Sequence, residues 1–126
     1  MIIGIGIDAV SITRFDKLIE LRGERLLRKL FSESEIEEGI KRDKHASFFA
    51  ARFAAREAFV KALGTGFRQG VSLRDIGVIK DDLGKPELSF TKRVQDALRA
   101  KGITKCHLSI THDGDSAQAI VILEGA

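Results

Sequence analysis

The sequence contains no tryptophan and no tyrosine, and it has one cysteine, one proline and one methionine in 126 residues. The single thiol, Cys106, has no second cysteine with which to form an internal disulfide, which fits a protein of a reducing compartment. Its neighbours are apolar and strand-like, so Cys106 is also a weak candidate for a catalytic nucleophile.

Long hydrophobic runs are missing as well. The apolar start, MIIGIGIDAV, has no preceding basic residues, is too short to span a bilayer and runs directly into Asp8. We therefore expect a cytoplasmic protein without a membrane partner. Repeats, low-complexity tracts and proline- or serine-rich linkers are also lacking, so we expect one domain over residues 1–126.

The overall amino-acid composition is that of an ordinary globular protein. Hydrophobic residues make up 44% of the chain and charged residues 31%, a balance that excludes disordered and fibrous classes. The formal net charge of +3 and the pI of about 9.2 are compatible with an anionic partner. They do not distinguish a nucleotide from an acidic protein.

The residue patterns predict an α+β fold, with a largely antiparallel sheet packed on a long central helix. Ile3, Ile5 and Ile7 alternate with Gly4, Gly6 and Asp8, which indicates a strand with one nearly bare face. The other expected elements are helices over about 13–22, 32–42, 46–63 and 90–101, a strand over 75–81, a turn over 81–86, and two antiparallel strands, KCHLSIT and AQAIVIL.

The long helix carries a candidate site. Ala50, Ala54, Glu57 and Lys61 fall on one side of it, and the alanines would allow the bare face of the first strand to approach. Docking there would bring Asp8 toward Glu57, next to Lys61. Two converging carboxylates suit Mg²⁺, which takes its remaining ligands from water and substrate phosphates.

A glycine-rich segment follows this helix. Gly64, Thr65 and Gly66 offer backbone that an anion can approach closely, and together with Lys61 they indicate a pyrophosphate and metal site. Each signal also has a plainer explanation. Glu57 and Lys61 are spaced as a solvated helix ion pair, Asp8 could be a turn or cap residue, and the glycines could simply end the helix.

Two further patterns allow more than one interpretation. In HLSITHD, the polar side chains of His107, Ser109 and Thr111 share one strand face, which is either solvated or lines an anion site; no elbow motif supports a hydrolase triad. The second pattern is a basic stripe that would form if 14–29 were one helix, although Gly23 makes that continuity doubtful. It suits either docking of an acidic amphipathic helix or plain solvation.

Four motifs, GIGIDAVSITRF, ARFAAREAFVKALGTGF, DDLGKPEL and HLSITHD, resemble in order and spacing those of the holo-[acyl-carrier-protein] synthases, the small group of the 4′-phosphopantetheinyl transferases. The resemblance covers nearly the whole chain. It implies transfer of 4′-phosphopantetheine from coenzyme A to a serine of apo acyl carrier protein, with release of adenosine 3′,5′-bisphosphate and a requirement for Mg²⁺. It also implies a homotrimer with active sites at subunit interfaces.

The resemblance assigns roles to residues of this sequence. Asp8 and Glu57 match the metal ligands, and Lys61 the lysine that neutralises charge as the phosphorus–oxygen bond breaks. Glu57, or a water held by the metal, is the candidate base. Matches to the coenzyme A contacts are Arg52, Lys61, Gly64, Thr65, Gly66, Lys85, Pro86, His107 and Ser109. Matches to the carrier-protein docking surface are Arg14, Lys17, Leu21, Arg22, Arg25 and Arg28.

Two other functional classes remain open on the sequence. A non-catalytic module that binds coenzyme A or a nucleotide would retain Lys61 and the glycines but would not need Asp8 and Glu57 together. A small RNA-binding domain would use the basic stripe. However, the eight phenylalanines occupy core-like positions rather than interleaving with surface cations, so we expect no nucleic-acid partner.

Overall fold

The computed structural model describes residues 1–64 and 72–126. In chain order, the elements are β1 (Ile2–Ser11), α1 (Ile12–Arg22), α2 (Glu24–Leu30), α3 (Glu33–Ile40), α4 (His45–Leu63), the 3₁₀ turn η1 (Leu73–Asp75), β2 (Ile76–Lys80), β3 (Pro86–Phe90), α5 (Lys92–Ala100), β4 (Ile103–Asp113) and β5 (Ser116–Gly125). Strands β1, β5 and β4 form one antiparallel sheet in that order, and β2 and β3 form an antiparallel pair. The predicted α+β class with antiparallel pairing is confirmed.

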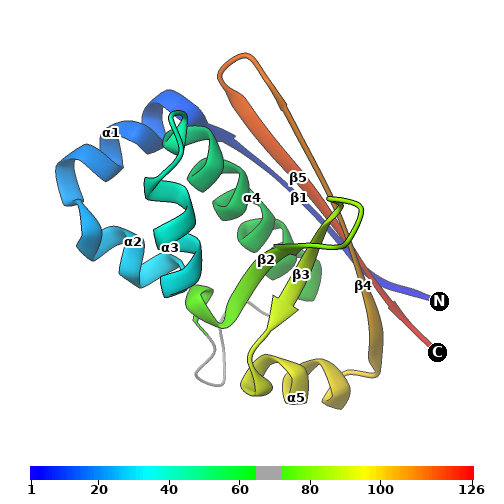
Figure 1. Cartoon of the computed structure of the whole chain (residues 1–126). Coiled ribbons are helices and arrows are strands. Elements are labelled where there is room, and N and C mark those ends of the chain that lie inside the picture. Colours follow the sequence, from blue (N-terminus) through cyan, green and yellow to red (C-terminus); the bar gives the residue numbers. More distant parts are fainter. Residues whose placement is uncertain (65–71) are drawn as a thin grey trace.

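Helix α4 is the central element, with α1, α2 and α3 on one side of it and the β1–β5–β4 sheet on the other (Figure 1). It contributes to both apolar clusters of the core. One cluster packs Ala54, Ala58 and Phe59 of α4 with residues of the strands and α5. The other packs Phe48 and Phe49 of α4 with residues of α1, α2 and α3.

The phenylalanines account for much of this core, as predicted. Phe15, Phe31, Phe48, Phe49 and Phe59 are buried. The rings of Phe15 and Phe31 meet edge to face at 6.4 Å, and those of Phe31 and Phe49 lie 5.1 Å apart. Such contacts stabilise a core beyond the burial of apolar area alone. Within the described residues, no helix combines the length and the apolar character needed to cross a membrane.

Local signals explain where several helices begin and end. Ser32 and Glu35 form the predicted capping box of α3. Helix α4 ends at Gly64, whose φ of 77° is the left-handed conformation that favours glycine. Helix α1 ends at Gly23, whose φ of 62° also favours glycine but whose ψ of −149° differs from the conformation of Gly64. The chain therefore breaks into α1 and α2, and the single helix that would have carried the whole basic stripe does not form.

The sequence misplaced three other features. The sequence predicts a turn over 81–86 and no strand directly after it, whereas strand β3 begins at Pro86. The helix expected over 90–101 begins at Lys92, since Phe90 pairs with Ile76 in the β2–β3 ladder. Helix α3 ends at Ile40, slightly before the expected end near 42.

Candidate active site

The bare face of β1 docks against α4. A Cβ atom on Gly4 would overlap the carbonyl oxygen of Ala62, and one on Gly6 would overlap that of Ala58. Only glycine lets the strand and the helix approach so closely. The predicted docking is thus confirmed, but the alanines that meet the glycines are Ala58 and Ala62 rather than Ala50 and Ala54.

This approach brings the predicted charged residues together. Lys61 Nζ donates to Asp8 Oδ1 at 3.0 Å and to the carbonyl oxygen of Ile7 at 3.0 Å. Glu57 lies one turn earlier on α4. Burial raises the pKa of Glu57, the nearby Asp8 carboxylate raises it further, and Lys61 lowers it. Two carboxylates and one ammonium therefore converge where β1 meets the C-terminal half of α4.

The donor set fits a hard divalent cation. Asp8 is mostly shielded, with 16% of its side chain exposed, whereas Lys61 is 55% exposed and can move away from it. Clusters of three or more His, Cys, Asp or Glu suited to a metal do not occur in the described part of the chain. A pair of carboxylates is nevertheless the protein contribution that Mg²⁺ typically uses when substrate phosphates and water complete its coordination.

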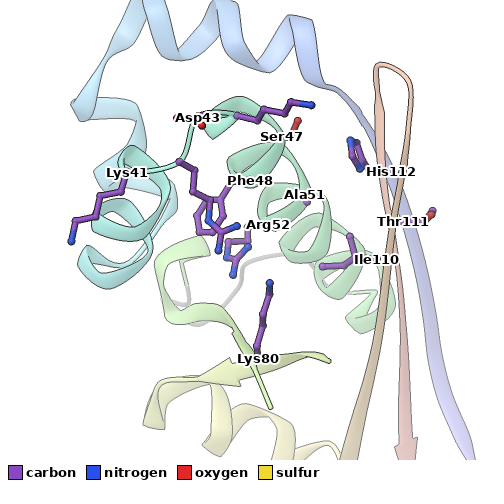
Figure 2. A pocket seen from close by; sticks show the side chains of 12 residues that line it. Lys41, Asp43, Ser47, Phe48, Ala51, Arg52, Lys80, Ile110, Thr111 and His112 are labelled. Carbon is purple, nitrogen blue, oxygen red and sulfur yellow. The ribbon is translucent and has the colours of Figure 1, made fainter. Parts of the chain in front are cut away.

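A second feature, which the sequence did not reveal, is a basic pocket of about 690 Å³ between the start of α4, the end of β2 and the end of β4 (Figure 2). Its cationic or potentially cationic lining residues are Lys41, Arg42, Lys44, Arg52, Lys80 and His112. In Figure 2, Arg52 and Lys80 reach into the same space from α4 and β2. Such a concentration of positive charge favours a multiply charged anion.

Arg52 was predicted to contact coenzyme A, and the structure places it in this basic pocket. Its side chain is only 10% exposed, and its guanidinium lies 3.8 Å from the centre of the Phe48 ring. The histidine that shares the pocket is His112, not the predicted His107. The alternation of side chains along the strand could have predicted this. His112 lies on the same strand face as Leu108 and Ile110, whose side chains face the core.

His107 and Ser109 lie on the other face of the sheet, away from α4. They pair with Ile122 and Ile120 of β5, which are opposite Ile5 and Ile7 of β1. His107 Nε2 contacts Glu124 Oε1 at 2.9 Å, so its side chain meets a carboxylate rather than the Ser109 hydroxyl. Within one chain, these two residues are not brought to the Asp8 site.

The remaining predicted coenzyme A contacts fall into two stretches of the sequence, 64–66 and 85–86. Gly64 lies at the end of α4, whereas Thr65 and Gly66 lie outside the described residues. Lys85 belongs to the turn between β2 and β3, where its backbone N–H donates to Asp81 Oδ1 at 2.9 Å. Pro86 pairs with Lys80, which connects this turn to the basic pocket.

The predicted docking residues are all exposed, but they are divided between α1 and α2. Arg14, Lys17, Leu21 and Arg22 lie on α1, and Arg25 and Arg28 lie on α2. A hollow of about 470 Å³ lies where the two helices meet, lined by Leu21, Arg22, Arg25, Leu26 and Lys29. The break at Gly23 thus yields a hollow with cations and leucines in place of a straight stripe.

The start of α1 is fixed by the turn between β4 and β5. Asp115 accepts hydrogen bonds from the Thr13 backbone N–H at 2.8 Å, from the Thr13 hydroxyl at 2.5 Å and from the Ser11 hydroxyl at 2.7 Å. Hydrogen bonds from Thr13 and Ser11 lower the pKa of Asp115. The hairpin therefore holds the first turn of the helix that carries Arg14.

Cys106 is not a plausible nucleophile in this structure. Burial raises the pKa of its thiol to about 11. The thiol therefore remains protonated near neutral pH, and it is the thiolate that reacts.

Comparisons with known proteins agree with this geometry. Residues 4–120 match the family model of the 4′-phosphopantetheinyl transferase superfamily. The chain belongs to that superfamily. It is 44% identical over 124 residues to a holo-[acyl-carrier-protein] synthase of Geobacter sp. strain M21, covering 98% of this chain and 99% of that one.

Solved structures of the superfamily share the fold. The holo-[acyl-carrier-protein] synthase of Neisseria meningitidis superposes with a TM-score of 0.92 at 39% identity, covering 98% of this chain and 99% of that one. The synthase from Bacillus anthracis, solved in complex with coenzyme A (3′,5′-ADP), superposes with a TM-score of 0.80 at 36% identity, covering 100% and 99% of the two chains. The predicted family is confirmed.

Proposed function

We propose that this chain is a holo-[acyl-carrier-protein] synthase. It transfers 4′-phosphopantetheine from coenzyme A to a serine hydroxyl of apo acyl carrier protein and releases adenosine 3′,5′-bisphosphate. The observation that carries the assignment is the convergence of Asp8, Glu57 and Lys61 where β1 meets α4, in a chain whose full-length relatives are named as such synthases.

The reaction requires attack of a hydroxyl on the pyrophosphate of coenzyme A. The serine oxygen bonds to the phosphorus next to pantetheine, the bridging phosphorus–oxygen bond breaks, and the hydroxyl proton must be removed. Glu57, or a water that the metal would hold beside Glu57 or Asp8, is the proposed base, because these carboxylates converge with Lys61 where the pyrophosphate is proposed to bind. Lys61 is proposed to neutralise charge on the leaving phosphate, which requires its ammonium to move from Asp8.

We propose that Asp8 and Glu57 hold Mg²⁺. Their shared site supports this, since Asp8 contributes to the raised pKa of Glu57 and a cation between the carboxylates would relieve that repulsion. When bound, Mg²⁺ would offset the charge of the pyrophosphate and orient it. The Lys61 ammonium, 3.0 Å from Asp8 Oδ1, offsets part of the Asp8 charge.

The basic pocket is the proposed site for the nucleotide end of coenzyme A. Its arginines and lysines match the charge of the 3′-phosphate, and Arg52, with 10% of its side chain exposed, is better shielded than Arg42, with 46%. Gly64, Thr65, Gly66, Lys85 and Pro86 remain proposed contacts for other parts of the molecule. The complex of the Bacillus anthracis synthase with coenzyme A (3′,5′-ADP) supports coenzyme A as the co-substrate of this fold.

The acyl carrier protein is proposed to dock on α1 and α2. The hollow lined by Leu21, Arg22 and Arg25 offers cations to attract an acidic helix and an apolar side chain to hold it. Arg14, Lys17 and Arg28 extend the same positive surface, and all are exposed.

We propose a homotrimer, because an apolar face of the sheet is exposed in the single chain and another copy could bury it. On the face away from α4, Ile3 is 45% exposed, Ile5 59% and Ile7 61%. His107 and Ser109 belong to this same face. A second copy on it would bury the isoleucines and would offer these two residues to a neighbouring site, which a single chain does not achieve. Light scattering tests the mass: a monomer at micromolar concentration would contradict this proposal.

We also propose that the chain acts as one domain in the cytoplasm. Both apolar clusters draw on α4, and Val10 packs against each of them, so the two halves should unfold together. The lone, half-buried thiol of Cys106 fits a reducing compartment. Two separate thermal transitions would contradict the single domain.

The release of adenosine 3′,5′-bisphosphate tests the reaction. Chromatography of mixtures with coenzyme A, Mg²⁺ and apo acyl carrier protein should show release in proportion to the carrier. A carrier whose acceptor serine is replaced by alanine should give none. Equal release without a carrier would indicate hydrolysis of coenzyme A and would contradict the proposed transfer.

A further inference from the structure

A buried ionic cluster joins the start of α3 to the middle of α4. The Glu35 carboxylate is buried between the guanidinium groups of Arg52 and Arg56. Arg56 is fully engaged within the fold: it donates to Glu35 Oε1, to the carbonyl oxygen of Leu73 at 3.0 Å and to that of Arg52 at 3.2 Å. Arg56 is completely buried and cannot contact a ligand.

Arg52 is held differently. Its Nε lies 3.6 Å from Glu35 Oε2, beyond hydrogen-bond distance. Neither of these buried atoms, Arg52 Nε and Glu35 Oε2, makes a hydrogen bond with the described residues. The guanidinium rests on the Phe48 ring and lines the basic pocket, as Figure 2 shows. Arg52 is thus held at the basic pocket by Glu35 and Phe48, with Glu38 Oε2 a further 3.9 Å from its Nη2, while it retains donor capacity for an anion.

Glu35 is itself fixed from the opposite side. Its Oε1 accepts hydrogen bonds from the Ser32 backbone N–H at 3.2 Å and from the Ser32 hydroxyl at 3.0 Å, in addition to the bond from Arg56. The carboxylate therefore has one oxygen committed to the fold and the other oxygen facing Arg52. Because Oε1 is held by the fold, Glu35 can present Oε2 at a fixed position to Arg52, the cation that would bind the ligand.

We propose that Glu35 is a positioning residue that holds Arg52 in the basic pocket for the 3′-phosphate of coenzyme A. The role rests on the proposed function, because it assumes that coenzyme A is the ligand. Arg52 and Arg56 are one helical turn apart, so without the carboxylate between them their like charges would repel. Arg52 would then turn toward solvent and away from the basic pocket.

The sign of the effect separates this role from a simple electrostatic one. A carboxylate near an anion site lowers the local positive potential. If Glu35 only contributed charge, its replacement by neutral glutamine would strengthen coenzyme A binding. If Glu35 positions Arg52, the same replacement weakens binding, and it does so specifically for ligands that carry the 3′-phosphate.

Calorimetric titration of coenzyme A and of 3′-dephospho-coenzyme A, in the presence of Mg²⁺ and without carrier protein, measures this difference. For Glu35→Gln we expect coenzyme A affinity to fall on the order of tenfold, the scale of one lost charge-assisted hydrogen bond. Affinity for the dephospho ligand should change little. Glu37→Gln is the matched control, since Glu37 is an exposed glutamate of the same helix. It should bind both ligands as the wild type does.

Tighter binding of coenzyme A by Glu35→Gln, or equal losses for both ligands, would overturn the proposal. In an Arg52→Gln background, Glu35→Gln should cause no further loss, because the carboxylate acts through Arg52. If Glu35→Gln does not fold, Glu35→Asp carries the same test: it keeps the charge that Arg56 needs but shortens the reach to Arg52. Wild-type protein that binds neither ligand would reject the proposed function itself, whereas unchanged affinities in Glu35→Gln would reject only the positioning role.

Discussion

The Lys61 ammonium donates to Asp8 Oδ1 at 3.0 Å, which ties the last turns of α4 to the middle of β1. Residues far apart in the sequence meet there because Gly4 and Gly6 have no side chains to keep the strand away from the helix. Glu57 completes the group, and its pKa is raised first by burial and then by the negative charge of Asp8 next to it. The chemistry of the site therefore depends on the packing of glycines as much as on the charged groups.

Replacing either carboxylate should abolish transfer. We expect Asp8→Asn and Glu57→Gln each to lower the transfer rate at least about 100-fold, because each removes a ligand for the metal and its charge. The fold should persist, since Glu57 is only half-buried and its carboxylate is repelled by that of Asp8. Steady-state transfer assays at several Mg²⁺ concentrations, with circular dichroism of each variant, measure both quantities.

The matched control for these variants is Glu37→Gln, the same chemical change at an exposed position of α3. It should leave the rate unchanged. Substantial turnover of Asp8→Asn or Glu57→Gln at saturating Mg²⁺ would refute the assignment of these residues as metal ligands.

Adding one methyl group to the first strand should damage the whole site. In Gly6→Ala, the new Cβ would collide with the backbone of Ala58 and Ala62. Overpacking of this kind costs roughly 1–3 kcal/mol in the free energy of unfolding, and it would also move Asp8 away from Glu57. Urea denaturation and the transfer assay should both show a loss. A variant with wild-type stability and activity would contradict the close docking of β1 on α4.

Charge reversal on the docking hollow should separate the two substrates. Arg25→Glu is expected to raise the KM for acyl carrier protein at least about tenfold, because a charged contact with an acidic partner becomes repulsive. The KM for coenzyme A should stay within about twofold, since the basic pocket is formed by other residues. Arg14→Glu should behave in the same way.

Arg99→Glu, on exposed α5, is the control for these reversals. The Arg99 side chain is 77% exposed and forms an ion pair with Asp96 on the same helix. It should leave both KM values unchanged. Equal losses for the two substrates in Arg25→Glu would instead indicate local misfolding of α2.

The Asp115 cap of α1 should contribute stability that depends on pH. Its pKa is lowered in the folded protein by hydrogen bonds from Thr13 and Ser11. Its contribution is therefore fully present above the pKa of an unfolded aspartate and is lost as the pH falls through the lower folded value. Asp115→Asn should be less stable than the wild type at neutral pH, and the difference should shrink in acid. Thermal unfolding of both proteins from about pH 7 to pH 3 checks this trend. A difference that grows in acid would contradict it.

The sequence predicted those parts of the site that leave a local signature. Alternation of Gly4 and Gly6 with isoleucines indicated a bare strand face, and the helix that carries Glu57 and Lys61 has the length and small residues to receive it. The meeting of Asp8 with these residues could be inferred because a single docking event places all of them. Which alanines make the contact depended on the helix rotation, which the sequence pattern did not determine.

The basic pocket could not be predicted in this way, because its residues come from α4, β2, β4 and the segment before α4. No local pattern links Lys80 to His112. Strand β3 was missed for a different reason: Pro86 lacks a backbone N–H and usually avoids strand interiors, yet here it stands at the first position of the strand. The proposed roles of His107 and Ser109 rest on the proposed homotrimer, and the sequence pattern of one chain does not describe contacts between copies.

The most direct test of the account is the intact mass of apo acyl carrier protein after incubation with this protein, coenzyme A and Mg²⁺. We predict that the carrier gains the mass of one phosphopantetheine group, that a metal chelator prevents the gain, and that Glu57→Gln does not produce it. An unchanged carrier mass, with coenzyme A still bound to the protein, would contradict the assignment and would indicate a binding protein without transferase activity.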